Sequence, residues 1–250
     1  MTADPHSFPL PPTPFSGDSR IADPGAPVEW LRYGWGVFEK NPGVWVGLMA
    51  LFLVLIIATA MVPLVGGLAA HLLLPLLIAG MLTAVRKAEM DEEFRIGDLF
   101  LGFKEETSGL VLLGVLYMAG WLIIEVCMTL LGGSAILGGF LSGHPLMGMS
   151  IAIGGMFLAF ILSLALSIPL FMATWFSPAL VLFNHMQPWA ACKASFHACL
   201  KNLVPFLVFG IIFAVLAFVA ALPMGLGFLV LGPVMFGALY ASYRDIFPGS

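Results

Sequence analysis

Glu125 and His71 are the one carboxylate and the one imidazole inside the apolar segments that could form transmembrane helices. A charged side chain at the centre of such a helix costs about 2.5–3.5 kcal/mol on insertion scales, so an acid there is a functional candidate by default. At 1.5 Å per residue, Glu125 lies about 9 Å and His71 about 6 Å inside the same membrane boundary. We hypothesise that they pair, with His71 stabilising an ionised Glu125 or sharing its proton. The alternatives are that each reaches interfacial water separately, or that Glu125 is protonated and bonds to a backbone group.

The composition explains why these two residues are exceptional. Of the 250 residues, 60% are hydrophobic and 10% are charged, whereas about 25% of an ordinary soluble domain is charged. The chain is therefore predicted to be an integral membrane protein. Ten Lys and Arg against fourteen Asp and Glu give a net charge of −4, which excludes a nucleic-acid-binding surface. The three cysteines have no framework spacing, which excludes a disulfide scaffold.

Uncharged intervals define four of the predicted spans. No Asp, Glu, Lys or Arg occurs in residues 41–85 or 202–243, and each interval is long enough for two helices of about 20 residues. Proline and glycine at 63–67 and 223–225 indicate a tight turn in the middle of each interval.

The middle of the chain is predicted to hold the other two spans. Residues 107–192 contain a single charge, Glu125. We expect spans at 109–131 and 150–171, joined by a glycine-rich uncharged loop. The apolar run 170–184 is too short for a further span and is interrupted by a proline, so we expect a broken extension of the fourth helix along the interface.

The basic residues predict the topology. With these six spans, every Lys and Arg falls on one side of the membrane, which the positive-inside rule makes the cytoplasmic side. The predicted fold is an all-α integral membrane protein of six transmembrane helices, arranged as three cytoplasm-rooted hairpins with both termini in the cytoplasm. The ten residues are Arg20, Arg32, Lys40, Arg86, Lys87, Arg95, Lys104, Lys193, Lys201 and Arg244.

Two amphipathic helices, at 27–41 and 188–201, are predicted to lie flat in the membrane interface. Each has a polar face and an apolar face, and Trp30, Tyr33, Trp35 and Trp189 are the expected interfacial anchors. Residues 1–26 are rich in proline and have no apolar segment, so a disordered cytoplasmic tail is expected rather than a secretory signal.

An internal repeat is predicted within the membrane domain, residues 27–248. Units 27–86 and 188–244 flank the middle hairpin, 107–184, and each reads as interfacial helix, span, turn, proline-containing span and Arg. At an offset of 158 residues, Gly67, Leu68, Leu73, Pro75 and Arg86 match Gly225, Leu226, Leu231, Pro233 and Arg244. The alternative is that all membrane hairpins share this pattern.

Other residues are assigned mainly structural roles. Small side chains at every fourth position of the fourth span favour close helix packing over a substrate path; they are Gly155, Ala159, Ser163 and Ser167. Prolines inside spans favour structural kinks over gates; they are Pro75, Pro169 and Pro233.

No metal or cofactor is predicted. Cys192, Cys199, His185 and His197 lack the spacing of a zinc site, and both cysteines lie on an apolar face. The acidic run 89–93 is expected to be a solvated loop rather than a cation site, and a lone His144 is a weak candidate for a pH sensor or a metal ligand. Motifs of serine hydrolases, zinc proteases and phosphate-binding loops do not occur, so we do not expect an enzyme.

Aromatic and proline landmarks resemble an uncharacterised bacterial inner-membrane family. They are Trp30–Trp45 (WLRYGWGVFEKNPGVW), Trp175–Val181 (WFSPALV), Ala194–Phe196 and Lys201-Asn202. The segment Ile96–Phe103 (IGDLFLGF) is similar to one in other multi-pass families of unknown function. The resemblance covers nearly the whole chain after the tail and implies a six-span inner-membrane protein, with no known activity or catalytic residue.

Two functions are expected from these observations. The first is a non-enzymatic protein that organises the envelope or binds other membrane proteins, with lipid, such partners or a second copy as its contacts. The alternative is a small transporter or channel with a proton or cation path at Glu125 and His71. A polar cavity that runs inward from Glu125 would favour transport, and a closed apolar bundle would favour the first function.

Overall fold

The computed structural model describes residues 15, 17–63, 65–141, 143 and 145–248, which form helices and, over these residues, no strand. The order is α1 (Ala26–Lys40), α2 (Pro42–Ala60), α3 (Gly66–Glu89), the 3-10 helix η1 (Ile96–Phe103), α4 (Thr107–Leu141), α5 (Pro145–Trp175), α6 (Ser177–Asn184), α7 (Pro188–Lys201), α8 (Leu203–Ala221) and α9 (Phe228–Ile246). The expected all-helical class is confirmed.

Five described segments are helical, long and apolar enough to cross a membrane: Pro42–Ala60, Gly66–Glu89, Thr107–Gly138, Gly148–Asn184 and Leu203–Ala221. The expected sixth span, α9, is not among them. Its last turns contain Ser242, Tyr243, Arg244 and Asp245, and in a helix of 19 residues no apolar stretch of span length avoids them.

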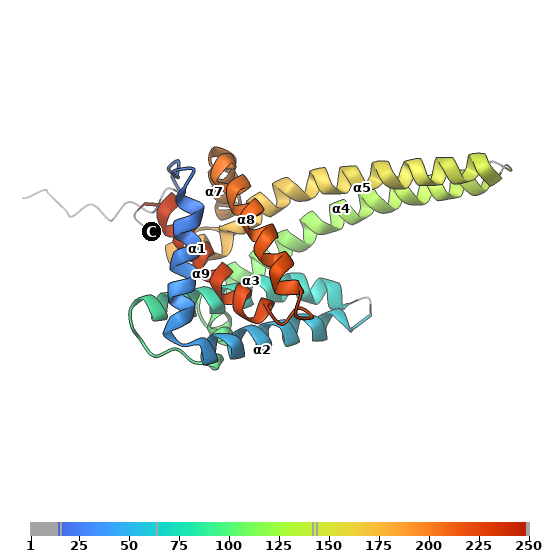
Figure 1. The fold of residues 1–250 in the computed structure, drawn as a ribbon. Helices are drawn as coiled ribbons and strands as arrows, with labels where there is room; N and C mark the ends of the chain where they lie inside the picture. Colours follow the sequence, from blue (N-terminus) through green and yellow to red (C-terminus); the bar gives the residue numbers. More distant parts are fainter. Residues whose placement is uncertain (1–14, 16, 64, 142, 144, 249–250) are drawn as a thin grey trace, which may run out of the picture.

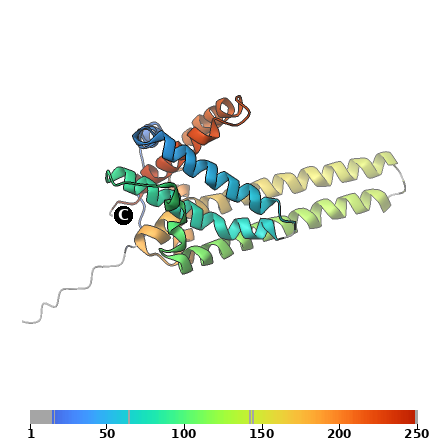
Figure 2. The same ribbon diagram turned by 90° about the horizontal axis from the view of Figure 1, so that it is seen from below.

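The glycine-rich loop expected between the third and fourth spans is instead helical. Helix α4 continues to Leu141 and α5 begins at Pro145, so Gly132, Gly133 and Gly138 lie within a helix. At 1.5 Å per residue, the 35 residues of α4 are about 52 Å long, against about 30 Å for a bilayer core. In Figures 1 and 2 the α4–α5 hairpin projects well beyond the ends of the other helices.

The broken extension of the fourth helix expected at 170–184 is present, and its position along the interface stays a prediction. Helix α5 runs to Trp175, and a separate helix, α6, follows with most of its residues buried. Ser195 of α7 stabilises the break, because its hydroxyl accepts a hydrogen bond from the Phe176 backbone N–H at 3.0 Å and donates one to the Met172 carbonyl at 2.6 Å. A proline near the start of α6 favours a new helix at this point.

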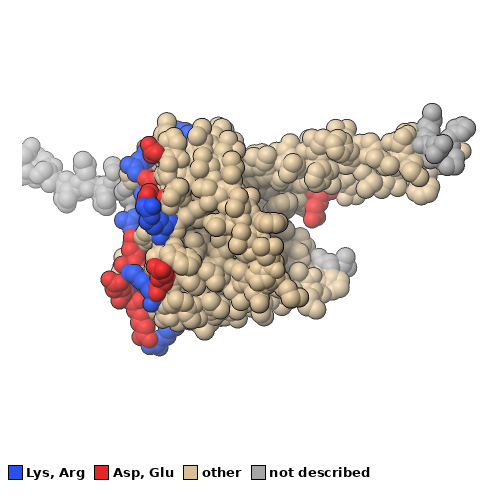
Figure 3. Space-filling view, in the orientation of Figure 1, with Lys and Arg blue, Asp and Glu red and all other residues tan. Residues whose placement is uncertain are grey.

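Apart from Glu125 on α4, the charged side chains of the described residues lie at one end of the molecule, at the left in Figure 3. Helix α1 crosses this end at a steep angle to the long helices α2, α4 and α5 in Figure 1. Ion pairs join segments that meet there, including Lys40–Asp91 at 2.5 Å, Lys87–Asp98 at 3.0 Å and Arg244–Glu89 at 3.0 Å. The other end of the molecule is apolar, as the uncharged intervals predicted.

Helices occur where the two amphipathic helices were expected, at Ala26–Lys40 and Pro188–Lys201, within one residue of their predicted bounds, and their position in the membrane interface stays a prediction. They have different neighbours, however. Helix α1 packs mainly on α9, whereas α7 packs mainly on α5. The internal repeat stays a prediction, because the two units share an order of elements but not these contacts.

Part of the segment expected as a disordered tail packs against the protein. Phe15 makes an edge contact with Phe247, with ring centroids 6.2 Å apart. The Ala22 backbone N–H donates to Asn202 Oδ1 at 2.7 Å, and Ala22 is buried. Residues 1–14 and 16 lie outside the described residues, as does His144.

Candidate functional site

Glu125 on α4 and His71 on α3 line the same pocket, which has a volume of about 190 Å³. Trp121 and Leu122 of α4 and Gly67 of α3 complete much of its wall. The two helices approach closely nearby, since a Cβ added at Gly114 would lie 2.9 Å from the Leu72 Cα atom. Residue counting placed Glu125 and His71 at similar depth, and in the structure their side chains line the same pocket.

The two side chains are not bonded to each other. His71 Nδ1 lies 2.6 Å from the Gly67 carbonyl oxygen, which can only accept, so Nδ1 carries a hydrogen. Glu125 is exposed, and among the described residues no hydrogen bond or ion pair joins it to His71. The structure brings the predicted pair together without a direct contact, and proton sharing stays a hypothesis.

A larger apolar pocket, of about 430 Å³, lies where α2, α3, α4, α5, α8 and α9 meet. Its volume falls within the range of about 300–1,000 Å³ found for small-molecule sites. Trp121 also lines the Glu125–His71 pocket, so the two pockets share a wall. The aromatic lining residues are Tyr117, Trp121, Phe171, Trp175, Phe213, Phe228 and Phe236.

Most polar groups at this apolar pocket are already bonded within the protein. The Tyr117 hydroxyl donates to the Thr174 carbonyl at 2.8 Å and lies 3.0 Å from Ser177 Oγ. The Trp175 indole N–H is buried and has no hydrogen-bond partner among the described residues. The pocket is therefore suited to an apolar molecule rather than to ions or water.

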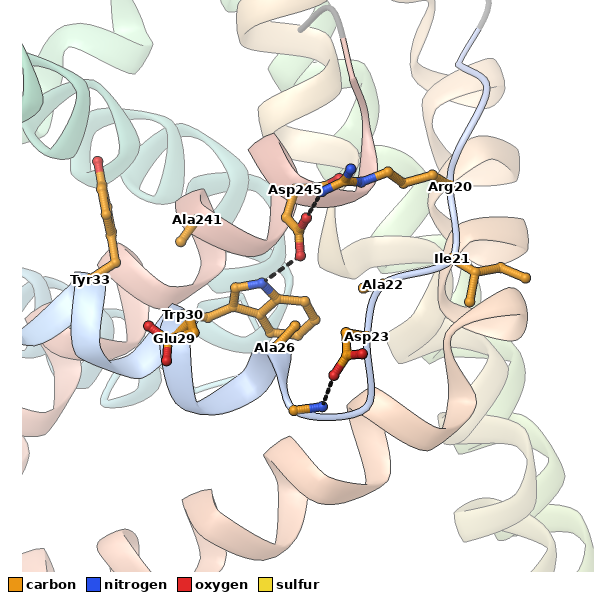
Figure 4. A pocket seen from close by; sticks show the side chains of 11 residues that line it. Arg20, Ile21, Ala22, Asp23, Ala26, Glu29, Trp30, Tyr33, Ala241 and Asp245 are labelled. Carbon is orange, nitrogen blue, oxygen red and sulfur yellow. Dashed lines mark hydrogen bonds and ion pairs between the residues drawn. The ribbon is translucent and has the colours of Figure 1, made fainter.

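An open groove of about 800 Å³, lined by both charged and apolar side chains, lies at the charged end between the N-terminal segment, α1 and α9 (Figure 4). Asp245 accepts hydrogen bonds from the Trp30 indole at 2.9 Å and from Arg20, with which it also forms an ion pair. Sequence reasoning missed this groove because it assigned residues 17–25 to a disordered tail. No motif in the sequence signals the contact between Arg20 and Asp245.

The four expected interfacial anchors divide into two groups. Trp30 is 3% exposed and contacts Phe206 and Phe209, with ring centroids 5.9 and 6.1 Å apart. Trp35 and Trp189 are 48% and 64% exposed and face away from the protein.

Tyr33, the fourth expected anchor, is half-buried and stacks on Tyr240, with ring centroids 6.4 Å apart. Its hydroxyl is buried and makes no hydrogen bond within the described part of the chain. Burial and the nearby Glu89 carboxylate raise the pKa of Tyr33. Tyr33 therefore stays neutral at physiological pH.

The small side chains and prolines lie within helices. On α5, Ala159 is buried, the other three small residues are half-buried or nearly so, and Ser167 Oγ donates to the Leu164 carbonyl of its own helix. A Cβ added at Gly132 of α4 would lie 3.9 Å from the Ala159 Cβ, so this face meets α4. Pro75 of α3 and Pro233 of α9 are buried, and Pro169 of α5 is exposed.

No group of three or more metal-ligating side chains occurs within the described ranges. Cys192 and Cys199 are buried in α7, and His185 Nδ1 lies 2.6 Å from Glu106 Oε1. In the acidic run, Glu89 accepts from Tyr240 and Arg244 at 2.9 and 3.0 Å, so this carboxylate ties α3 to α9.

A comparison with curated proteins finds one that is described as a probable inner membrane protein, from Burkholderia thailandensis. It is 27% identical over 241 residues, which cover 87% of this chain and 89% of the relative. No family model matches the chain. No solved structure matches it.

The similarity extends along almost the full length of both proteins, and five helices of the chain are suited to a membrane. These findings define the class as a helical membrane protein. The resemblance to an inner-membrane protein of uncharacterised function, predicted from aromatic and proline landmarks, is confirmed to this extent.

Proposed function

We propose that this chain is a bacterial, multi-pass inner-membrane protein that binds other membrane proteins and organises the envelope without catalysing a reaction. The observation that carries the proposal is the α4–α5 hairpin, whose helices have 35 and 31 residues. Both are longer than a bilayer core requires. A partner that covers the excess would explain the length.

The exposed surface of the hairpin supports this role. Leu130, Leu137 and Phe140 of α4 are 66%, 60% and 83% exposed, and the described part of the hairpin has no charge beyond Glu125. Large apolar patches on proteins mark sites of contact with a membrane or another protein. The hairpin is longer than the membrane core is thick, so part of its apolar surface is expected to contact a protein neighbour.

Six spans with both termini in the cytoplasm are part of the proposal. Helix α9 returns to the charged end, where Arg244 meets Glu89 of α3 and Asp245 meets Arg20. Since α8 leaves that end at Asn202, a crossing by α8 implies a return by α9. The buried environment of α9 compensates for its more polar last turns, because ten of its 19 residues are buried within the protein.

Site-specific photo-crosslinking tests the partner-binding role. A photoreactive residue at Phe140 is expected to yield a protein adduct in membranes, whereas one at Phe218 of α8, which is 69% exposed, should react with lipid. A purified sample separates the occupants, because an adduct of twice the chain mass identifies a second copy. Lipid adducts alone at both positions would contradict the proposal.

A small transporter or channel is the alternative, and the pocket shared by Glu125 and His71 favours it. The neighbouring cavity is lined mainly by apolar side chains, which argues against an ion path that continues inward. Proton or cation flux into liposomes, compared between the natural chain and Glu125→Gln, separates the two functions. A flux that depends on Glu125 would support transport, and equal rates would support the partner-binding role.

A further inference from the structure

The Glu125–His71 pocket and the apolar pocket follow one another along α3 and α4. On α4, Glu125, Trp121 and Tyr117 follow one another at intervals of one turn, toward the charged end of the molecule. On α3, His71 lines the polar pocket, and Leu74 and Ile78 line the apolar one further toward the charged end. A molecule that fills both pockets must be an amphiphile.

The polar pocket presents hydrogen-bond acceptors. His71 Nδ1 donates to the Gly67 carbonyl, and in the tautomer with its hydrogen on Nδ1, Nε2 accepts hydrogen bonds. A carboxylate at Glu125 has two oxygens that accept hydrogen bonds and no donor. Trp121 adds an aromatic ring, 6.0 Å from the His71 ring centroid, and an indole face attracts cations.

This combination selects the charge of the head group. An ammonium group has three N–H donors and a positive charge, so it matches two acceptors and an aromatic ring. Phosphate or carboxylate groups placed there would be repelled by Glu125. The carboxylate lacks a partner among the described residues, and a cationic head group would supply one.

We propose that the two pockets form one binding site for a membrane phospholipid with a primary-amine head group. Glu125 and His71 hold the ammonium, Trp121 lies between head and chain, and an acyl chain occupies the apolar pocket. The acyl chain then points toward the charged end of the protein. A lipid has this orientation when it belongs to the leaflet farther from the charged end. The proposal is independent of a protein partner at the α4–α5 hairpin.

Native mass spectrometry of the full chain, released from detergent with defined lipids, tests the proposal. We expect phosphatidylethanolamine to be retained at least about tenfold more than phosphatidylglycerol of the same chains, as charge-assisted hydrogen bonds to the amine predict. Phosphatidylcholine, which has the charge but no N–H donor, is expected to be retained less than phosphatidylethanolamine. Equal retention of phosphatidylethanolamine and phosphatidylglycerol would overturn the proposal.

Variants locate the site. Glu125→Gln should bring the ratio of the two lipids close to one, Glu125→Asp should preserve a preference, and Glu29→Gln, at an exposed ion pair of α1, should change nothing. Ile78→Phe fills the apolar pocket and should reduce the number of retained phosphatidylethanolamine molecules. A preference that survives Glu125→Gln would place the amine elsewhere. Crosslinking at Phe140 is measured on the same variants, so failure of the lipid site and failure of partner binding can be distinguished.

Discussion

Trp30 and Trp35 lie on one amphipathic helix and have opposite surroundings. The Trp30 ring lies among the rings of α8, and its N–H donates to Asp245 of α9. Trp35 donates to Glu39 one turn along the same helix and remains exposed. A helical wheel places both on a broad apolar arc, but only the position of α8 and α9 decides which part of that arc is covered.

The thiols of α7 provide a prediction about pH. Burial raises the pKa of Cys192 to about 11 and that of Cys199 to about 12. Because the thiolate is the form that reacts with maleimide, we expect labelling of both at pH 8–9 to be at least about tenfold slower than that of an ordinary thiol, whose pKa is about 8.5. Burial of the neutral thiols also favours folding below about pH 8.5, and this contribution is lost as the pH rises toward 11 and 12.

Lys193→Cys, at an exposed position beside Cys192, is the matched control, in a chain that carries Cys127→Ser. It should react at the ordinary rate, and detergent denaturation should equalise all three thiols. Cys192 or Cys199 reacting as fast as the control in the folded protein would contradict their burial.

At the scale of elements, the α4–α5 hairpin shows why glycine content mispredicted a loop. Glycine in a helix costs about 1 kcal/mol relative to alanine in water, so several glycines favour a turn there. In lipid, a loop leaves backbone N–H and C=O groups unbonded at several kcal/mol each. The helix around Gly132 pairs these groups internally, as an apolar surface requires whether lipid or a protein neighbour covers it.

The crossing of α1 and α9 depends on two glycines. A Cβ at Gly34 would lie 2.1 Å from the Val234 carbonyl oxygen, and one at Gly237 would lie 2.5 Å from the Gly34 Cα atom. Gly34→Ala must separate the two backbones, and we expect it to lower the free energy of unfolding by about 2–3 kcal/mol. Unfolding in detergent micelles, followed by circular dichroism, measures this loss.

Gly36→Ala, on the same helix, is the control, because a Cβ there meets nothing within 4 Å. It should leave stability unchanged or raise it by up to about 1 kcal/mol. A similar loss for both variants would contradict the role of the backbone contact, because alanine increases helix propensity at either position and meets a neighbour only at Gly34.

At the scale of the whole molecule, the described charged residues other than Glu125 lie at one end, and the rest of the surface is mainly apolar. This asymmetry distinguishes one end of the protein from the other. Ion pairs at that end connect the N-terminal segment with α9, α3 with η1 and α9, and α1 with the residues after α3. They are Arg20–Asp245, Lys87–Asp98, Arg244–Glu89 and Lys40–Asp91. These pairs are partly exposed, and exposed ion pairs contribute little to the free energy of unfolding. They show which segments meet at the charged end.

Reporter fusions test the proposed topology. A fluorescent protein fused after Ser250 is expected to fluoresce in a bacterial host, because it folds in the cytoplasm. Alkaline phosphatase inserted after Met61 or Met224 is expected to be active, because both turns should lie outside. An active phosphatase after Ser250 would mean that α9 does not cross, and five spans would then replace six.

Much of the fold was determined by the sequence itself. Three features of the sequence predict where helices lie without knowledge of their neighbours: the uncharged intervals, the positions of the ten basic residues and the prolines at helix starts. The reason is that the free-energy cost of a charge or an unbonded backbone group in lipid depends on that group alone. Residue counting along two neighbouring spans likewise placed Glu125 and His71 near each other, and both line one pocket.

Only the tertiary structure decided which of these surfaces are covered. It placed Trp30 inside the protein, ordered the segment from Arg20 to Gly25 against α9, and put the apolar pocket beside Glu125. These outcomes depend on contacts between residues far apart in the chain, such as Arg20 with Asp245, and no periodicity within one helix encodes them. The free-energy cost of burying single groups in lipid determines where the helices lie in the sequence. Packing between the helices determines what each site can bind.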